Sequence, residues 1–92
     1  MFTQDYIFLS ASPYSMTDKE TGEVVKGTSV FLAPVRGTNE DRLVGAKPQK
    51  FNQPFDSFQT TYSKLEYLQQ YEFEMEARAV GNTVKLILVG LA

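Results

Sequence analysis

The sequence predicts a mainly β domain: a five-stranded Greek-key barrel with one short helix between strands 3 and 4. Three observations lead to this prediction. Apolar and polar residues alternate in two hairpin-like segments, one near each end of the chain. Between them, apolar residues recur at helical spacing. The length of 92 residues fits one domain, residues 1–92, because so short a chain cannot support two cores.

Residues 6–16, YIFLSASPYSM, predict the first strand. Ile7, Leu9 and Ala11 share one face, which we expect to be the core. The opposite face carries aromatic and hydroxyl side chains, namely Tyr6, Phe8, Ser10, Ser12 and Tyr14. Hydroxyl groups are unusual on a buried surface, so this face is a candidate for binding.

The charged segment DKETGE, residues 18–23, predicts a turn, and residues 24–35 predict the returning strand. Within that strand, Gly27 suggests a bulge or a sharp bend, and Pro34 is expected to end it.

The middle of the chain predicts a short third strand at 42–47, then an irregular segment KPQKFNQP, then a helix. Pro54 suits a first helical position, and from Phe55 the apolar residues fall on one helical stripe with Phe58, Tyr62 and Leu65. We expect this stripe to plug one end of the barrel.

The last third predicts a hairpin. Residues 71–80 predict a strand with one buried face, because apolar and charged side chains alternate from Tyr71 to Ala79. Gly81 and Asn82 predict the turn, and residues 83–91 predict a final strand that is apolar on both faces.

Five strands with a helix between the third and fourth is the element order of the OB-fold, a partly open barrel that commonly binds oligonucleotides. The structural alternative is an SH3-like barrel, in which a loop or a short 3₁₀ turn would replace the helix.

Composition argues against catalysis. The chain has no cysteine and no histidine, which removes disulfides, thiolate metal sites, the commonest general base and the commonest zinc ligand. We therefore expect no enzyme, no cofactor and no metal. The row Glu72, Glu74 and Glu76 fits a solvated strand face better than a metal site. No stretch resembles a signal peptide or a membrane span, so a cytoplasmic protein is expected.

Basic and aromatic residues predict a nucleic-acid interface. A protein that binds single strands needs cations for the phosphates and aromatic faces on which bases stack. Six of the nine basic residues precede residue 51, and four of the eleven acidic residues lie between 66 and 76. The candidate interface comprises Tyr6, Phe8, Tyr14, Lys19, Lys26, Arg36, Arg42, Lys47, Lys50 and Phe51. The competing interpretation is that the aromatic side chains fill a core or a dimer interface and that the basic ones are ordinary solvated surface.

Together, the long first hairpin, the basic and aromatic middle and the closing hairpin YEFEMEARAVGNTVKLILVGLA resemble the small single-stranded DNA-binding, helix-destabilising proteins of filamentous phages and related mobile elements. The likeness covers most of the chain in size, element order and character, without a diagnostic motif. It implies a homodimer that coats single-stranded DNA during replication, with no membrane or small-molecule partner. The alternative is a protein-interaction module that uses the aromatic face or an exposed strand edge.

Overall fold

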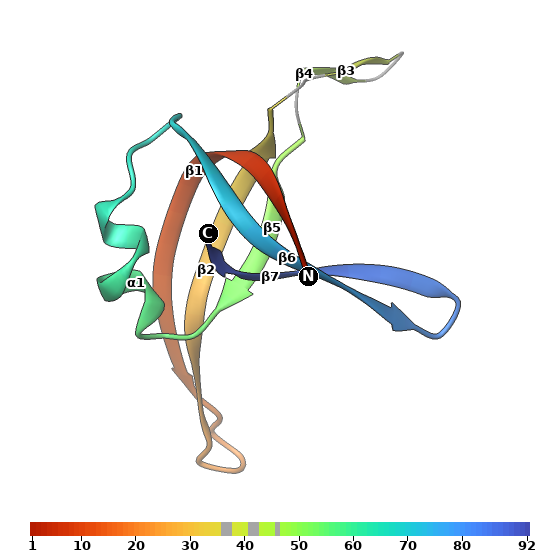
Figure 1. Ribbon diagram of the computed structural model, residues 1–92. Coiled ribbons are helices and arrows are strands. Elements are labelled where there is room, and N and C mark those ends of the chain that lie inside the picture. The colour runs from red at the N-terminus through yellow and green to blue at the C-terminus, as the bar shows by residue number, and fades with distance from the viewer. Residues whose placement is uncertain (36–37, 41–42, 46) are drawn as a thin grey trace.

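The main element of the protein is one antiparallel five-stranded sheet with the strand order β5-β2-β1-β6-β7 (Figure 1). The computed structural model describes the backbone of residues 1–35, 38–40, 43–45 and 47–92, and the side chains of residues 1–35 and 47–92. The sheet strands are β1 (Phe2–Thr17), β2 (Val24–Pro34), β5 (Gln49–Gln53), β6 (Gln70–Val80) and β7 (Thr83–Leu91). The predicted mainly β class and both predicted terminal hairpins are confirmed.

The predicted third strand, 42–47, is wrong as a member of this sheet. Residues Leu43–Gly45 form β4, which pairs with β3 (Thr38–Glu40) in a two-stranded hairpin separate from the main sheet. The fifth strand of the sheet is β5, in the segment that was expected to be irregular. Its lysine and asparagine have low β-propensity, and tertiary packing of Phe51 against the core overrides that local preference.

The predicted helix is present but short. It consists of α1 (Ser57–Thr60) and a 3₁₀ turn, η1 (Tyr62–Lys64), and the chain is extended again at Leu65. Thr60 and Thr61, which have low helix propensity, lie where α1 ends, and Asp56 makes no side-chain capping bond that would stabilise the start of the helix. Tyr62 is buried and Leu65 packs against the core, so the apolar stripe does contribute to the interior.

In the first half of β1 the core lies on the opposite face from the one expected, whereas Ala11, which was expected in the core, does pack against it. Tyr6 and Phe8 are 1% and 6% exposed, whereas Ile7 and Leu9 are only half-buried. The register explains the outcome: Phe8 pairs with Leu32 and Ser10 with Phe31, which leaves Leu9 as a bulge. An extra residue exchanges the two faces of a strand, so the first half of β1 buries its even-numbered residues and the second half turns them outward.

The rest of the core comes from β2, β5, β6, β7 and the 3₁₀ turn: its buried members are Val30, Leu32, Phe51, Tyr62, Phe73, Met75 and Leu88. Apolar contact between the two terminal hairpins therefore holds the sheet in its curved shape (Figure 1).

Of the bulge or sharp bend predicted at Gly27, the bulge is absent, because β2 pairs with β1 in continuous register from Val24 to Phe31. The second irregularity of the sheet lies between β6 and β7, at Glu74 and Met75. Both interruptions accompany curvature of the sheet, which brings its two outer strands toward each other.

β5 and β7 approach without forming a ladder, so the sheet is not closed. The contact between them is a hydrogen bond in which Gln53 Nε2 donates to the backbone oxygen of Leu88 at 2.6 Å. The hydroxyl of Tyr62 in turn donates to Gln53 Oε1 at 3.2 Å. One side chain thus joins the sheet edges and the helical segment.

The β1–β2 and β6–β7 hairpins extend beyond the body of the sheet in different directions, and the pair β3–β4 projects from it as well (Figure 1). The turns of β1–β2 and β6–β7 use Gly22 and Gly81, whose φ angles of 75° and 59° favour glycine. The radius of gyration, 15.0 Å, reflects these projections, since a compact domain of this length would have a value of about 12 Å.

Candidate nucleic-acid interface

The outer face of β1, β2 and β5 carries a groove of about 310 Å³, called the outer groove below. Its position follows from the register, which aligns Tyr14 with Gly27, Met16 with Val25 and Ser29 with Asn52. The lining residues are Tyr14, Met16, Val25, Ser29, Lys50 and Asn52. One aromatic ring, exposed apolar side chains and a lysine therefore share one surface.

Tyr14 lies across β2 at the position of Gly27. A Cβ atom built on Gly27 would be 2.6 Å from the Tyr14 hydroxyl oxygen and 3.2 Å from the backbone oxygen of Gln53. Any side chain at position 27 would therefore displace the ring. Glycine is required here by the close approach of Tyr14, and the half-buried ring is held against the sheet beside the groove.

Phe31 adds a second aromatic side chain to this face. It is 37% exposed and pairs across strands with Lys50. Directly opposed residues in an antiparallel pair have side chains on the same face. A cation and an aromatic ring are therefore adjacent on the outer surface, next to the end of the outer groove that Lys50 lines.

Three predicted interface residues are in the core instead: Tyr6, Phe8 and Phe51 are at most 8% exposed. Tyr6 makes edge-to-face contacts with Phe51 and Phe73, with ring centroids 6.0 and 6.2 Å apart. Burial also raises the pKa of Tyr6. The prediction that these three rings are available to bases is therefore wrong, and the competing interpretation, that they fill a core, is correct for them.

The predicted basic residues are not all brought together. Lys19 is exposed in the turn of the β1–β2 hairpin, and Lys47 is exposed just before β5. The ammonium group of Lys26 lies 5.3 Å from the ring centroid of Phe55, a cation–π contact with the segment that leads into α1. Among the predicted basic residues with described side chains, Lys50 alone lines the outer groove. Arg36 and Arg42 lie outside the described residues.

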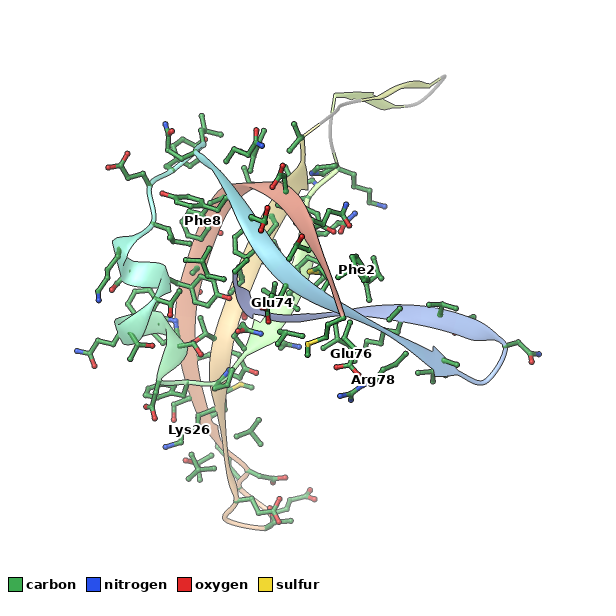
Figure 2. All side chains as sticks on the ribbon, viewed as in Figure 1. Phe2, Phe8, Lys26, Glu74, Glu76 and Arg78 are labelled. Atoms are coloured by element: carbon green, nitrogen blue, oxygen red, sulfur yellow. The ribbon has the colours of Figure 1, made fainter. Side chains whose placement is uncertain are left out.

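The acidic row on β6 is partly neutralised by its own strand. Arg78 Nε lies 3.2 Å from Glu76 Oε1, in a pair at the point where the β6–β7 hairpin leaves the body (Figure 2). Both side chains are solvent-accessible, so the pair contributes little to stability. Within the part of the chain that the structure describes, no three acidic side chains are grouped closely enough to hold a metal ion.

Sequence reasoning missed several residues of this surface: Met16, Val25, Ser29, Phe31 and Asn52. Phe31 lies in the predicted returning strand, but its neighbours Val30 and Leu32 are apolar as well, so the sequence of this strand does not show that Phe31 occupies the outer face. One signal in the sequence could have indicated this surface. A glycine inside a strand, such as Gly27, often lies where another group approaches the backbone closely.

None of three comparisons with known proteins returns a match, whether against family models, curated proteins or solved structures. In the described part of the chain, no helix has the length and apolar character needed to cross a membrane.

Proposed function

We propose that this protein binds single-stranded DNA through the outer groove and has no catalytic activity of its own. The observation that carries the proposal is the arrangement of Tyr14, held against Gly27, in the same groove as Lys50. An aromatic ring offers a stacking surface to any base, and a nearby lysine offers a counter-charge to the phosphate that follows it.

We further propose that the chain adopts an OB-fold with an open seam. The sheet order β5-β2-β1-β6-β7, with the helical segment between β5 and β6, supports this assignment. Since every neighbouring pair is antiparallel, β5 and β7 run in the same direction where they meet. OB-folds commonly bind oligonucleotides on the face of their second and third strands, which corresponds here to β2 and β5.

Binding of this kind does not depend on base sequence. Each stacked base contributes about 1 to 3 kcal/mol, and each neutralised phosphate releases counterions. Affinity should therefore fall steeply as the salt concentration rises. The net charge of only −2 means that attraction must come from local lysines rather than from the whole molecule.

A homodimer and a role in phage or mobile-element replication complete the proposal. The replication role rests on the resemblance of size and element order alone. For the dimer there is also a structural reason: the β6–β7 hairpin exposes Val80 and Val84 at 57% and 71% near its turn. A small domain with apolar residues on a projecting hairpin gains stability if a second copy covers them.

Tyrosine fluorescence provides the test, because the chain has five tyrosines and no tryptophan. Titration with oligo-dT at low ionic strength should quench the emission, and added salt should reverse the quenching. Lys50→Glu should weaken binding by about tenfold or more. The matched control is Lys64→Glu, a charge reversal of an exposed lysine on η1, outside the outer groove.

The proposal fails if the wild-type protein shows neither quenching nor a mobility shift with oligo-dT. It also fails if Lys50→Glu and Lys64→Glu weaken binding equally, because the effect would then come from net charge rather than from the groove.

A further inference from the structure

The open seam between β5 and β7 is a second hollow of the molecule, of about 270 Å³. Its walls include Lys50 and Asn52 from β5, and Lys85, Leu86 and Leu88 from β7. Lys50 and Asn52 also line the outer groove. The two hollows therefore meet along β5 and form one continuous surface.

The seam is positively charged. Lys50 and Lys85 line it from opposite sides, and its lining contains no acidic side chain. Both lysines are exposed. An anion in the seam would thus have an ammonium group on each side, and Asn52 offers a further hydrogen-bond donor.

A hydrogen-bonded clasp, formed by Gln53, Leu88 and Tyr62, spans the seam. Gln53 follows Asn52 on β5 and reaches across to the backbone oxygen of Leu88 at 2.6 Å. Its other amide atom accepts from Tyr62, which is 2% exposed and therefore firmly placed. The clasp holds the strands together at one end, and the seam is the space that stays open between them.

We infer that the seam is a second phosphate-binding subsite for the same single strand. The DNA backbone would pass from the outer groove over β5 and place a phosphate between Lys50 and Lys85. This inference rests on the proposed function. It assigns a DNA contact to Lys85, which the sequence analysis does not include among the interface residues.

Lys85→Gln tests the subsite without endangering the fold, because the side chain is exposed and lies opposite Arg78. Two oligo-dT probes should be compared by fluorescence anisotropy: one of about 4 nucleotides, short enough for one hollow, and one of about 12. We expect Lys85→Gln to weaken binding of the longer probe about three- to tenfold and to leave the shorter probe nearly unchanged. The slope of log affinity against log salt should fall by about 0.7 for one lost phosphate contact.

Lys64→Gln is the matched control, since it removes one exposed charge outside both hollows. The inference is overturned if Lys85→Gln behaves like Lys64→Gln, or if both probe lengths lose affinity equally. Such a result would leave the proposed function intact, provided that Lys50→Glu still weakens binding.

A last arm separates DNA from an acidic polypeptide, which offers the seam similar charges. Poly-glutamate should compete with the longer oligo-dT only weakly, and its competition should not depend on Lys85. If poly-glutamate displaces the DNA at comparable concentration and Lys85→Gln abolishes this effect, the seam is a peptide site and the inference is wrong. If oligo-dT does not bind to the wild-type protein at all, the inference falls with the proposed function.

Discussion

Tyr14 and Gly27 are directly opposed across β1 and β2, and the ring of the tyrosine occupies the space that a side chain at position 27 would need. The backbone at position 27 does not need a glycine, because its φ is not positive. The glycine matters because it leaves room for the ring of Tyr14.

Gly27→Ala should therefore weaken DNA binding while the fold persists. The added methyl group displaces the Tyr14 ring, and the loss of one stacking surface costs about 1 to 3 kcal/mol of binding free energy. Stability should change by less than about 1 kcal/mol, because alanine is favoured over glycine in a strand and offsets the local clash. Oligo-dT titration and thermal unfolding measure the two effects. In a Tyr14→Ala background, Gly27→Ala should have no further effect on affinity; additive losses would refute the proposed link.

Phe8 and Phe31 should respond in opposite ways to truncation. Phe8 is buried, so Phe8→Ala is expected to lower the free energy of unfolding by about 3 to 5 kcal/mol. Phe31 is 37% exposed on the outer face, so Phe31→Ala should cost much less stability and should reduce oligo-dT affinity. Urea unfolding and DNA titration on both variants check this contrast. Equal destabilisation by the two variants would contradict the assignment of faces to β1 and β2.

The Gln53 clasp should be a measurable source of stability. Gln53→Ala removes the hydrogen bond to Leu88 and deprives the buried hydroxyl of Tyr62 of its acceptor on Gln53, at a cost of about 1 to 3 kcal/mol. Because the two bonds share one side chain, Gln53→Ala and Tyr62→Phe should not be additive. A double-mutant cycle in urea provides the measurement, and strict additivity would show that the clasp does not act as a unit.

Alkaline pH should destabilise the protein through its buried tyrosines. Burial raises the pKa of Tyr62 to about 12 and also raises that of Tyr6. In the unfolded chain both hydroxyls ionise near pH 10, so the unfolded state releases protons that the folded state retains. The contribution of the protonated Tyr62 to the free energy of unfolding is complete below pH 10 and is lost as the pH rises through about 12. For Tyr62 the slope approaches about 1.4 kcal/mol per pH unit.

Tyr62→Phe separates this effect from general alkaline unfolding. The variant should be somewhat less stable at pH 8, because it lacks the hydrogen bond to Gln53, but its stability should decline less steeply above pH 10. Urea unfolding at pH 8, 10 and 11 gives the comparison. Parallel decline in the two proteins would show that Tyr62 does not titrate as its burial implies.

The terminal hairpins were predictable from sequence because alternation and turn chemistry act locally. Gly22 and Gly81 take positive φ inside the two segments, 18–23 and 81–82, that the sequence predicts as turns. The strand boundaries of β2 and β7 agree with the prediction to within a residue. Local signals of this kind need no knowledge of the rest of the fold.

The face of β1 and the identity of β5 were not predictable, because both depend on distant parts of the chain. The bulge at Leu9 is defined by pairing with β2 and leaves no mark in the sequence of β1 itself. β5 is a strand because Phe51 packs into a core built from both hairpins. The predicted site contains the same errors. Tyr14 and Lys50 do line the outer groove, whereas Tyr6, Phe8 and Phe51 are buried in the core.

Because of the bulge at Leu9, the aromatic residues of one strand lie on two different faces of the sheet. Tyr6, Phe8 and Tyr14 all have even numbers, and in an uninterrupted strand they would share a face. One surplus residue lets the first two serve the interior and the third serve the outer groove. If Leu9 paired in the ladder instead of bulging, Tyr6, Phe8 and Tyr14 would lie on the same face of β1. Either Tyr6 and Phe8 would then leave the core, or Tyr14 would be buried with them. The position of a single insertion, rather than the choice of aromatic residues, decides which rings are free to meet a ligand.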